Sequence, residues 1–433
     1  AVISGVEPYI TPQCDLNDGW VGAIVSAPTF AAIIAALTVT PLADHVGRKR
    51  VMTFLAALYS VSAFASAIAP TPMMVLVARF IGGFAFGTLM LAPIYIAELA
   101  PARLRGRMVS VNQFNIVIGF SLAYFANYFI QQLSQSDSSL AVSLDLERTA
   151  WRFMLGLEAL PAVLYFLFML IVPESPRWLA LNGREVAARG VLSRVAPAES
   201  IDALIADIRA SAHADTQTLG EKIRELGSPR LRLVLIVGLL AAVAQQSSGI
   251  NAVFFYAPTI FEQSGVGTDA AFAQAAYIGV VNVVFTIVAM LLIDTLGRRP
   301  LMLAGLLGIA SSMFLSAWGF HSDNPTLVLV GIMSFVGSFA FSLGPVMWVL
   351  FSEIFPNHVR GVCMAIMATV NSSVSWVVQF IFPTELARLG PVWTMAIFGL
   401  TAVVFFVLLA WLMPETRGRS LEELEIELTA GAG

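Results

Sequence analysis

The segments Asp44-His-Val-Gly-Arg-Lys49 and Asp294-Thr-Leu-Gly-Arg-Arg299 each end an apolar stretch of this 433-residue chain, and they lie 250 residues apart. Two further motifs repeat in the same order. Glu98, Pro101, Arg105 and Gly106 recur as Glu353, Pro356, Arg360 and Gly361, and Pro173, Glu174 and Arg177 recur as Pro414, Glu415 and Arg417. Three repeated motifs in one order indicate a chain built from two related halves.

The composition is that of a membrane protein. Charged residues make up 12% of the chain and hydrophobic residues 58%, whereas soluble domains are typically about 25% charged. Apolar runs near 20 residues are long enough to span a bilayer as helices. They occur at residues 20–43, 51–69, 73–98, 108–132, 152–172, 232–263, 272–293, 300–320, 326–352, 361–386 and 391–413. Residues 1–10 are apolar but too short to span, so we expect the chain as given to start inside a twelfth helix.

The basic residues fall on alternate breaks between these runs. Lys and Arg concentrate at residues 44–50, 103–107, 177–232, 298–299, 360 and 417–419, while the other breaks hold only Arg148, Arg152 and Arg388. Basic loops of membrane proteins face the cytoplasm. We therefore expect a multi-pass protein of the bacterial inner membrane with both termini in the cytoplasm.

The one long polar stretch lies midway between the repeats. Residues 201–212 within it place Ile201, Leu204, Ile205 and Ile208 at helical spacing, which predicts short amphipathic helices on the cytoplasmic face; a flexible linker is the alternative. The predicted division is a six-helix bundle at 1–176 with a truncated first helix, a helical linker at 177–231, a second bundle at 232–416 and a cytoplasmic segment at 417–433.

The repeated charges have a physical logic. An Asp at a helix end can accept hydrogen bonds from backbone or arginine, a Gly permits a tight turn, and basic side chains stay in the headgroup layer. Simple anchoring of the topology is the alternative for a single copy. Two copies, each followed by a Glu and an Arg seven residues apart, favour a functional network.

These motifs resemble the sugar porters of the major facilitator superfamily, and most closely the bacterial xylose and proton symporters. The resemblance rests on the repeats above together with Pro173-Glu-Ser-Pro-Arg-Trp178, Gln245-Gln246, Gly249-Ile-Asn251 and Pro414-Glu-Thr-Arg-Gly418. It implies an all-α fold of twelve helices in two pseudo-symmetric bundles, with a site near the midplane. It also implies a cytoplasmic gate between the bundles, made by Asp44, Arg48, Glu98, Arg105, Asp294, Arg298, Glu353 and Arg360.

Several side-chain amides lie inside the apolar runs. Each offers two donors and an acceptor, which suits the hydroxyls of a sugar, although hydrogen bonds between helices are the alternative. By resemblance the sugar site contains Gln113, Gln245, Gln246, Asn251 and Asn282, with Trp348 as a stacking residue or else a core residue. Asn371 is a further amide inside the membrane.

The chain departs from the xylose symporters at four positions. Phe120 and Phe255 replace a glutamine and a tyrosine, and Asn371-Ser372 replaces a Gln-Trp pair. Hydrogen bonds and an aromatic wall are lost there. A pentose, a hexose or a cyclic polyol such as inositol therefore all stay open as the substrate.

Two charged residues, Arg79 and Glu158, lie inside apolar runs, where a charge costs about 2.5 to 3.5 kcal/mol and indicates function. By resemblance they couple transport to protons, with an aspartate two positions before Ala1 as the partner of Arg79. A purely structural role for Glu158 is the alternative.

We predict a secondary active transporter that imports a neutral monosaccharide by proton symport. A facilitative sugar or polyol uniporter and, less so, a sugar sensor are alternatives. The four histidines are scattered, and no pairing of nucleophile and base, phosphate-binding loop or metal spacing is present. We therefore expect no enzymatic activity, cofactor, metal or nucleic-acid partner, and a monomer whose partners are the sugar, the proton and the lipid bilayer.

Overall fold

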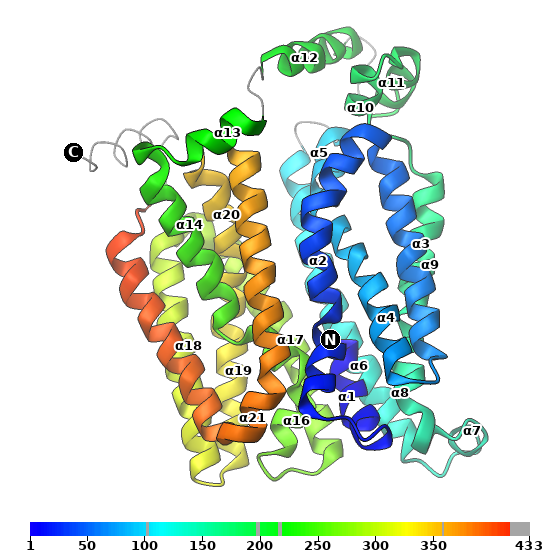
Figure 1. The fold of residues 1–433 in the computed structure, drawn as a ribbon, viewed down its shortest axis with the longest axis vertical. Helices are drawn as coiled ribbons and strands as arrows, with labels where there is room; N and C mark the ends of the chain where they lie inside the picture. The colour runs from blue at the N-terminus through cyan, green and yellow to red at the C-terminus, as the bar shows by residue number, and fades with distance from the viewer. Residues whose placement is uncertain (101–103, 196–199, 215–218, 357–358, 416–433) are drawn as a thin grey trace.

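The structure is a computed structural model that describes residues 1–100, 104–195, 200–214, 219–356 and 359–415. Figure 1 shows two groups of long helices side by side, with short helices beyond one end of the groups. We call α1 to α9 the N-terminal half and α14 to α21 the C-terminal half. The predicted segment at residues 417–433 lies outside the described residues.

The N-terminal half contains α1 (Val2–Gln13), α2 (Asp18–Val46), α3 (Arg48–Ala67), α4 (Pro72–Gly83), η1 (Phe84–Phe86), α5 (Gly87–Leu99), α6 (Arg105–Ser134), α7 (Ser139–Ser143), α8 (Leu146–Leu157) and α9 (Ala159–Ile171). The short helices are α10 (Pro176–Leu181), α11 (Glu185–Leu192), α12 (Ile201–Ala214) and α13 (Leu219–Leu226). The C-terminal half contains α14 (Pro229–Ser247), α15 (Ile250–Phe255), α16 (Ala257–Glu262), α17 (Thr268–Leu296), α18 (Arg298–His321), α19 (Pro325–Phe341), α20 (Leu343–Ile354) and α21 (Arg360–Leu412).

Ten helical stretches among the described residues are long and apolar enough to cross a membrane. One of them, α21, contains both of the last two predicted segments, which meet at Gly390 with a φ of 75° and a ψ of 167°. All eleven predicted segments are therefore helical. The first helix, α1, is 12 residues long. The prediction of an all-α membrane protein is confirmed.

Several apolar segments are interrupted inside the membrane. The predicted segment at residues 232–263 breaks twice, at Gly249 with a φ of 87° and at Tyr256. Other breaks lie at Glu158, between α8 and α9, and at Ser342, between α19 and α20. Breaks of this kind leave backbone groups without helical partners, and they are tolerated in a membrane only where protein or a water-filled cavity covers them.

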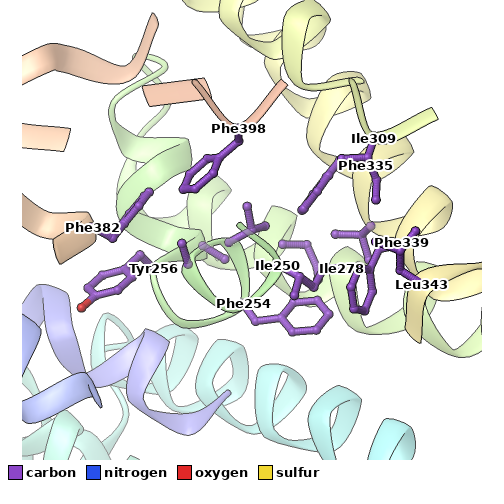
Figure 2. Packing of buried hydrophobic residues seen from close by; sticks show 14 of the residues in the cluster. Ile250, Phe254, Tyr256, Ile278, Ile309, Phe335, Phe339, Leu343, Phe382 and Phe398 are labelled. Carbon is purple, nitrogen blue, oxygen red and sulfur yellow. The ribbon is translucent and has the colours of Figure 1, made fainter. Parts of the chain in front are cut away.

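The break at Gly249 is held by aromatic packing. A Cβ at Gly249 would lie 2.9 Å from the ring of Phe398, so the position needs glycine for its space as well as for its positive φ. Phe398 stacks on Phe382 with ring centroids 6.3 Å apart, and Phe382 packs in a tilted arrangement against Tyr256 with ring centroids 5.0 Å apart. Figure 2 shows these rings gathered around α15 and α16. This core fixes the positions of the polar residues just before α15.

Candidate functional site

The repeated motifs build the same structure twice. Gly47 and Gly297 have φ values of 113° and 92° and make the turns from α2 to α3 and from α17 to α18. Glu174 accepts hydrogen bonds from the backbone of Lys49 at 2.9 Å, and Glu415 accepts them from the backbone of Arg298 at 3.0 Å and Arg299 at 3.1 Å. Each glutamate thus caps the first turn of the following helix, where a negative charge is favourable.

Basic side chains close the same turns. Arg48 donates to the carbonyl of Ala43 at 3.2 Å, and Arg298 to that of Ile293 at 3.0 Å. Lys49 donates to Leu170 at 3.1 Å, and Arg299 to Ala410 at 2.7 Å. The third repeated motif, which contributes Glu174 and Glu415, had no role assigned from the sequence. Its glutamates and these basic side chains together join the last helix of each half to this turn.

The gate candidates pair within each half in this structure. Arg48 lies 2.7 Å from Asp44 and 3.4 Å from Glu98, and Arg298 lies 2.7 Å from Glu353. Ser175 donates to Glu98 at 2.5 Å. Arg360 donates to the carbonyl of Phe355 at 3.2 Å, while the side chains of Arg105 and Asp294 lie outside the described residues. A network between the halves stays a prediction.

Four of the predicted amides form one buried network. Gln246 donates to Gln245 and to Asn371, both at 3.1 Å. Asn371 donates to Gln245 at 2.7 Å and to the carbonyl of Ala242 at 3.0 Å. Asn251 donates to Gln246 at 2.7 Å. The donors and acceptors of α14, α15 and α21 are thus oriented by one another before any ligand arrives.

The broken helix α19–α20 is also tied to this network. Gln245 donates to the carbonyls of Leu343 at 3.1 Å and Gly344 at 3.4 Å, in the first turn of α20 directly after the break at Ser342. The amide of Asn371 lies 3.7 Å from the sulfur of Met347. The residue after Met347 is Trp348, so the network reaches the turn of α20 that carries the predicted stacking tryptophan.

Three residues that sequence reasoning missed extend the network to the other half. Asn251 donates to Ser375 at 2.7 Å, as does Gln379. Thr29 on α2 donates to Gln379 at 2.9 Å. A spacing of four from Asn371 through Ser375 to Gln379 puts all three on one helix face, and this signal was present in the sequence.

Asn282 and Trp348 do not join these hydrogen bonds among the described residues. Asn282 on α17 is buried, and its side chain has no hydrogen-bond partner within the described part of the chain. Trp348 is 38% exposed and packs edge to face on Phe351 at 5.9 Å. Gln113 lies on α6, and its side chain is outside the described residues. Their roles as sugar ligands stay predictions.

One position that departs from the symporter pattern forms an apolar contact between the halves. Phe120 on α6 packs against Phe254 on α15 with ring centroids 5.3 Å apart. Nearby, Tyr124 donates to the carbonyl of Phe254 at 2.5 Å. Phe255 packs at the edge of the main core. An aromatic surface therefore lies at positions where the symporter pattern has hydrogen-bonding side chains.

The two intramembrane charges lie in one region of the N-terminal half. Arg79 donates to the carbonyl of Ile24 at 2.9 Å. Glu158 occupies the break between α8 and α9, close enough for its charge to act on Arg79. No direct ion pair joins them among the described residues. Their role in proton coupling stays a prediction.

The halves are hydrogen-bonded at the end of the molecule opposite α10 to α13. Thr259 on α16 donates to Glu7 on α1. Gln131 donates to Asp269 at 3.3 Å, and Ser121 to the carbonyl of Gly279 at 2.8 Å. These pairs join α1 and α6 of one half to α16 and α17 of the other. The structure is thus closed by contacts at this end.

Comparison with known proteins agrees with this architecture. A family model described as "Sugar (and other) transporter" matches residues 8–428. The chain is 34% identical to the glucose transporter GlcP of Staphylococcus epidermidis, over 100% of this chain and 94% of that protein. It is 37% identical to the D-xylose-proton symporter of Escherichia coli, over 80% of this chain and 70% of that protein.

Among solved structures, the inward open conformation of the xylose transporter XylE from E. coli matches with a TM-score of 0.83 and 31% identity, covering 98% of this chain and 95% of that chain. Its fold is the twelve-helix fold that the sequence predicts. The chain therefore belongs to the sugar transporter family of the major facilitator superfamily, and it is a multi-pass membrane transporter rather than an enzyme.

Proposed function

We propose that this chain imports a neutral monosaccharide together with a proton across a bacterial inner membrane, by alternating access to one central site. The network of Gln245, Gln246, Asn251 and Asn371 carries this proposal, because it is buried and made of uncharged donors and acceptors. Amides of this kind can exchange hydrogen bonds with sugar hydroxyls. Gln113, Asn282 and Trp348 complete the proposed site.

Two relatives, named for glucose and for xylose, leave open whether the sugar is a hexose or a pentose. The contact between Phe120 and Phe254 supports a substrate that presents an apolar face to α6. Aromatic rings favour the C–H face of a pyranose. We therefore place pyranose sugars first, hexoses and pentoses alike, with inositol as the other member of the test panel.

The proton is proposed to act through Arg79 and Glu158. Charged side chains inside the membrane are costly and usually mark a functional site. The charges of these two residues act on each other without a direct ion pair. One proton that moves down about 100 mV supplies about 2.3 kcal/mol. That is enough for roughly fifty-fold accumulation at about 1.4 kcal/mol per decade.

Uptake into proteoliposomes tests the proposal. We expect uptake of one monosaccharide from the panel to be accelerated by an inward proton gradient and by an inside-negative potential. Glu158→Gln should keep equilibrium exchange of the sugar but lose accumulation. If uptake responds to neither gradient, the protein catalyses facilitated diffusion and not symport. If no sugar of the panel is taken up, the assignment of a monosaccharide substrate is wrong.

The bundles at 1–176 and 232–416 are proposed to rock as bodies, with the segments at 177–231 and 417–433 in the cytoplasm. In the outward-facing state the charges now paired within each half would also pair across the inner end. Exposed pairs are worth roughly 0 to 1 kcal/mol each, so such a gate can open and close readily. We expect Glu98→Gln to favour inward-facing states, seen as changed thiol accessibility of an introduced cysteine from the two faces; unchanged accessibility would contradict the gate.

A further inference from the structure

A cavity at the outer end of the N-terminal half gathers two of the three basic residues that the sequence places on the outer face. It has a volume of about 200 Å³ and is lined by residues of α1, α4 and α8 and the links between them, including Gln13, Cys14, Thr71, Arg148, Trp151 and Arg152. The lining contains two arginines and no carboxylate. Basic residues are rare on outer loops, so their convergence on one cavity needs an explanation.

Internal contacts do not provide that explanation. The guanidinium of Arg148 makes no hydrogen bond or ion pair with the described part of the chain; only its backbone carbonyl is used, as acceptor for Gln13 at 3.1 Å. Arg152 lies over the ring of Trp151 at 4.3 Å and donates to the carbonyl of Ala67 at 3.1 Å. Its other N–H groups have no partner among the described residues, and neither arginine is paired with an acid.

The rest of the cavity holds Arg152 in place, while the side chain of Arg148 is exposed at its edge. Trp151 is buried and donates to Gln13 at 3.0 Å, so that its ring forms a fixed floor under Arg152. Thr71 caps the N-terminus of α4 by accepting from the backbone of Met74 at 3.3 Å. The positive end of the α4 dipole thus faces the same space. The cavity is more than about ten times the 10 to 15 Å³ that one water needs.

We propose that this cavity binds a phosphate-bearing anion at the outer face of the transporter. Two guanidinium groups with free N–H groups, beside a helix N-terminus, suit the tetrahedral oxygens of a phosphate. The source is either the headgroup of an anionic phospholipid or a soluble phosphate ester. Binding would link α1, α4 and α8, because residues from all three elements contact the same space.

Cys14 provides the measurement. It lines the cavity and is partly exposed, whereas the only other cysteine, Cys363, is 1% exposed. In a maltoside detergent, which lacks phosphate, a neutral maleimide should therefore react with Cys14 alone. An anion in the cavity should slow that reaction. The test adds either glycerol 3-phosphate or phosphatidylglycerol, with sodium chloride at matched ionic strength as the salt control.

We expect at least one of the two phosphate sources to slow alkylation several-fold, and the source that does so identifies the ligand. Arg148→Gln should weaken this protection about tenfold, as expected for loss of one charge-assisted contact, and the double change with Arg152→Gln should abolish it. Arg388→Gln is the matched control, because Arg388 is the third outer basic residue and is not in the cavity lining. Sugar-induced thermal shifts check that each variant is folded.

The proposal is overturned if neither phosphate source slows alkylation, if chloride does so equally, or if protection survives in the Arg148→Gln variant at wild-type strength. Because the Arg148 side chain has no described partner in the fold, this single variant keeps the test decisive even if the double variant does not fold. Sugar transport is not used as a readout, so failure here leaves the transport proposal untouched.

Discussion

At the scale of single residues, Asn371 connects the amide network. It donates to Gln245 and Ala242 and accepts from Gln246. Asn371→Ala leaves buried amide groups without partners, which typically costs about 1 to 3 kcal/mol. We expect a lower thermal unfolding midpoint and about tenfold weaker sugar binding by calorimetry. Ser373→Ala is the control, because Ser373 bonds only the carbonyl of Thr369 on its own helix; equal losses in both variants would remove Asn371 from the site.

The sequence predicted the members of this network better than its extent. Adjacent Gln245 and Gln246 before a Ser-Ser-Gly break suggested a site, and the structure brings both to Asn251 and Asn371. Ser375 and Gln379 were missed because single polar residues in an apolar helix look like tolerated exceptions. Their link to Thr29 spans 350 residues, and contacts at that separation depend on how the halves pack.

At the scale of helices, the two glutamates of the third motif act as caps. Glu174 and Glu415 each accept backbone hydrogen bonds at the start of a membrane helix, α3 or α18. Loss of such a cap costs about 0.5 to 2 kcal/mol, so we expect Glu174→Ala and Glu415→Ala to lower thermal stability by similar amounts. Asp137→Ala, in an exposed loop, should change little. A stable Glu174→Ala protein would contradict the capping role.

The short helices α11 and α12 are joined by exposed charges. Glu185 lies 3.0 Å from Arg189 and 2.6 Å from Arg209, and Arg189 lies 2.6 Å from Asp202. Hydrogen bonds from Arg189 and then Arg209 lower the pKa of Glu185 below its ordinary value. Because the pKa of Glu185 is lower in the folded protein, its charge stabilises the contact between α11 and α12 fully above about pH 4.3, the ordinary pKa of Glu. This stabilisation is lost as the pH falls through the lower pKa of the folded state.

Hydrogen exchange tests this link. We expect exchange of the α11 amides, corrected for the intrinsic rate, to be the same at pH 5 and pH 8. Glu185→Gln should speed it at pH 7, whereas Asp207→Asn, an exposed change on α12, should not. Faster exchange in wild type between pH 8 and pH 5 would show that another group controls this contact.

Hydropathy predicted where the helices lie but not where they break. The segment at residues 73–98 reads as one apolar run, yet it contains α4, η1 and α5. The break at Ser342 has no glycine at the position itself and follows an uninterrupted apolar run. Breaks depend on contacts with other helices, here the hydrogen bond from Gln245 on α14 to the carbonyl of Leu343 directly after the break, and a window of sequence does not contain that partner.

At the scale of the whole molecule, the duplicated turns and the contacts between the halves have different roles. The turns are built within each half, so they can travel with it unchanged. The hydrogen bonds of Thr29 with Gln379 and of Ser121 with Gly279 cross between the halves away from the ends of their helices. These contacts between the halves must change when the transporter changes state. Sequence cannot rank such states, because each uses the same residues with free energies that differ by little.

A close contact between α2 and α21 gives a test of this motion. A Cβ at Gly22 would lie 2.2 Å from the backbone carbonyl of Phe380, so a large side chain there must separate the two helices. We expect Gly22→Trp to favour the state that is open at this end, with sugar binding retained and transport lost. With Cys14→Ser and Ser375→Cys in the background, an impermeant thiol reagent added outside should label position 375 faster. Gly119→Trp, with no atom within 4 Å of its Cβ, should leave the labelling rate unchanged. Wild-type transport and labelling in Gly22→Trp would show that α2 and α21 do not form the outer closure.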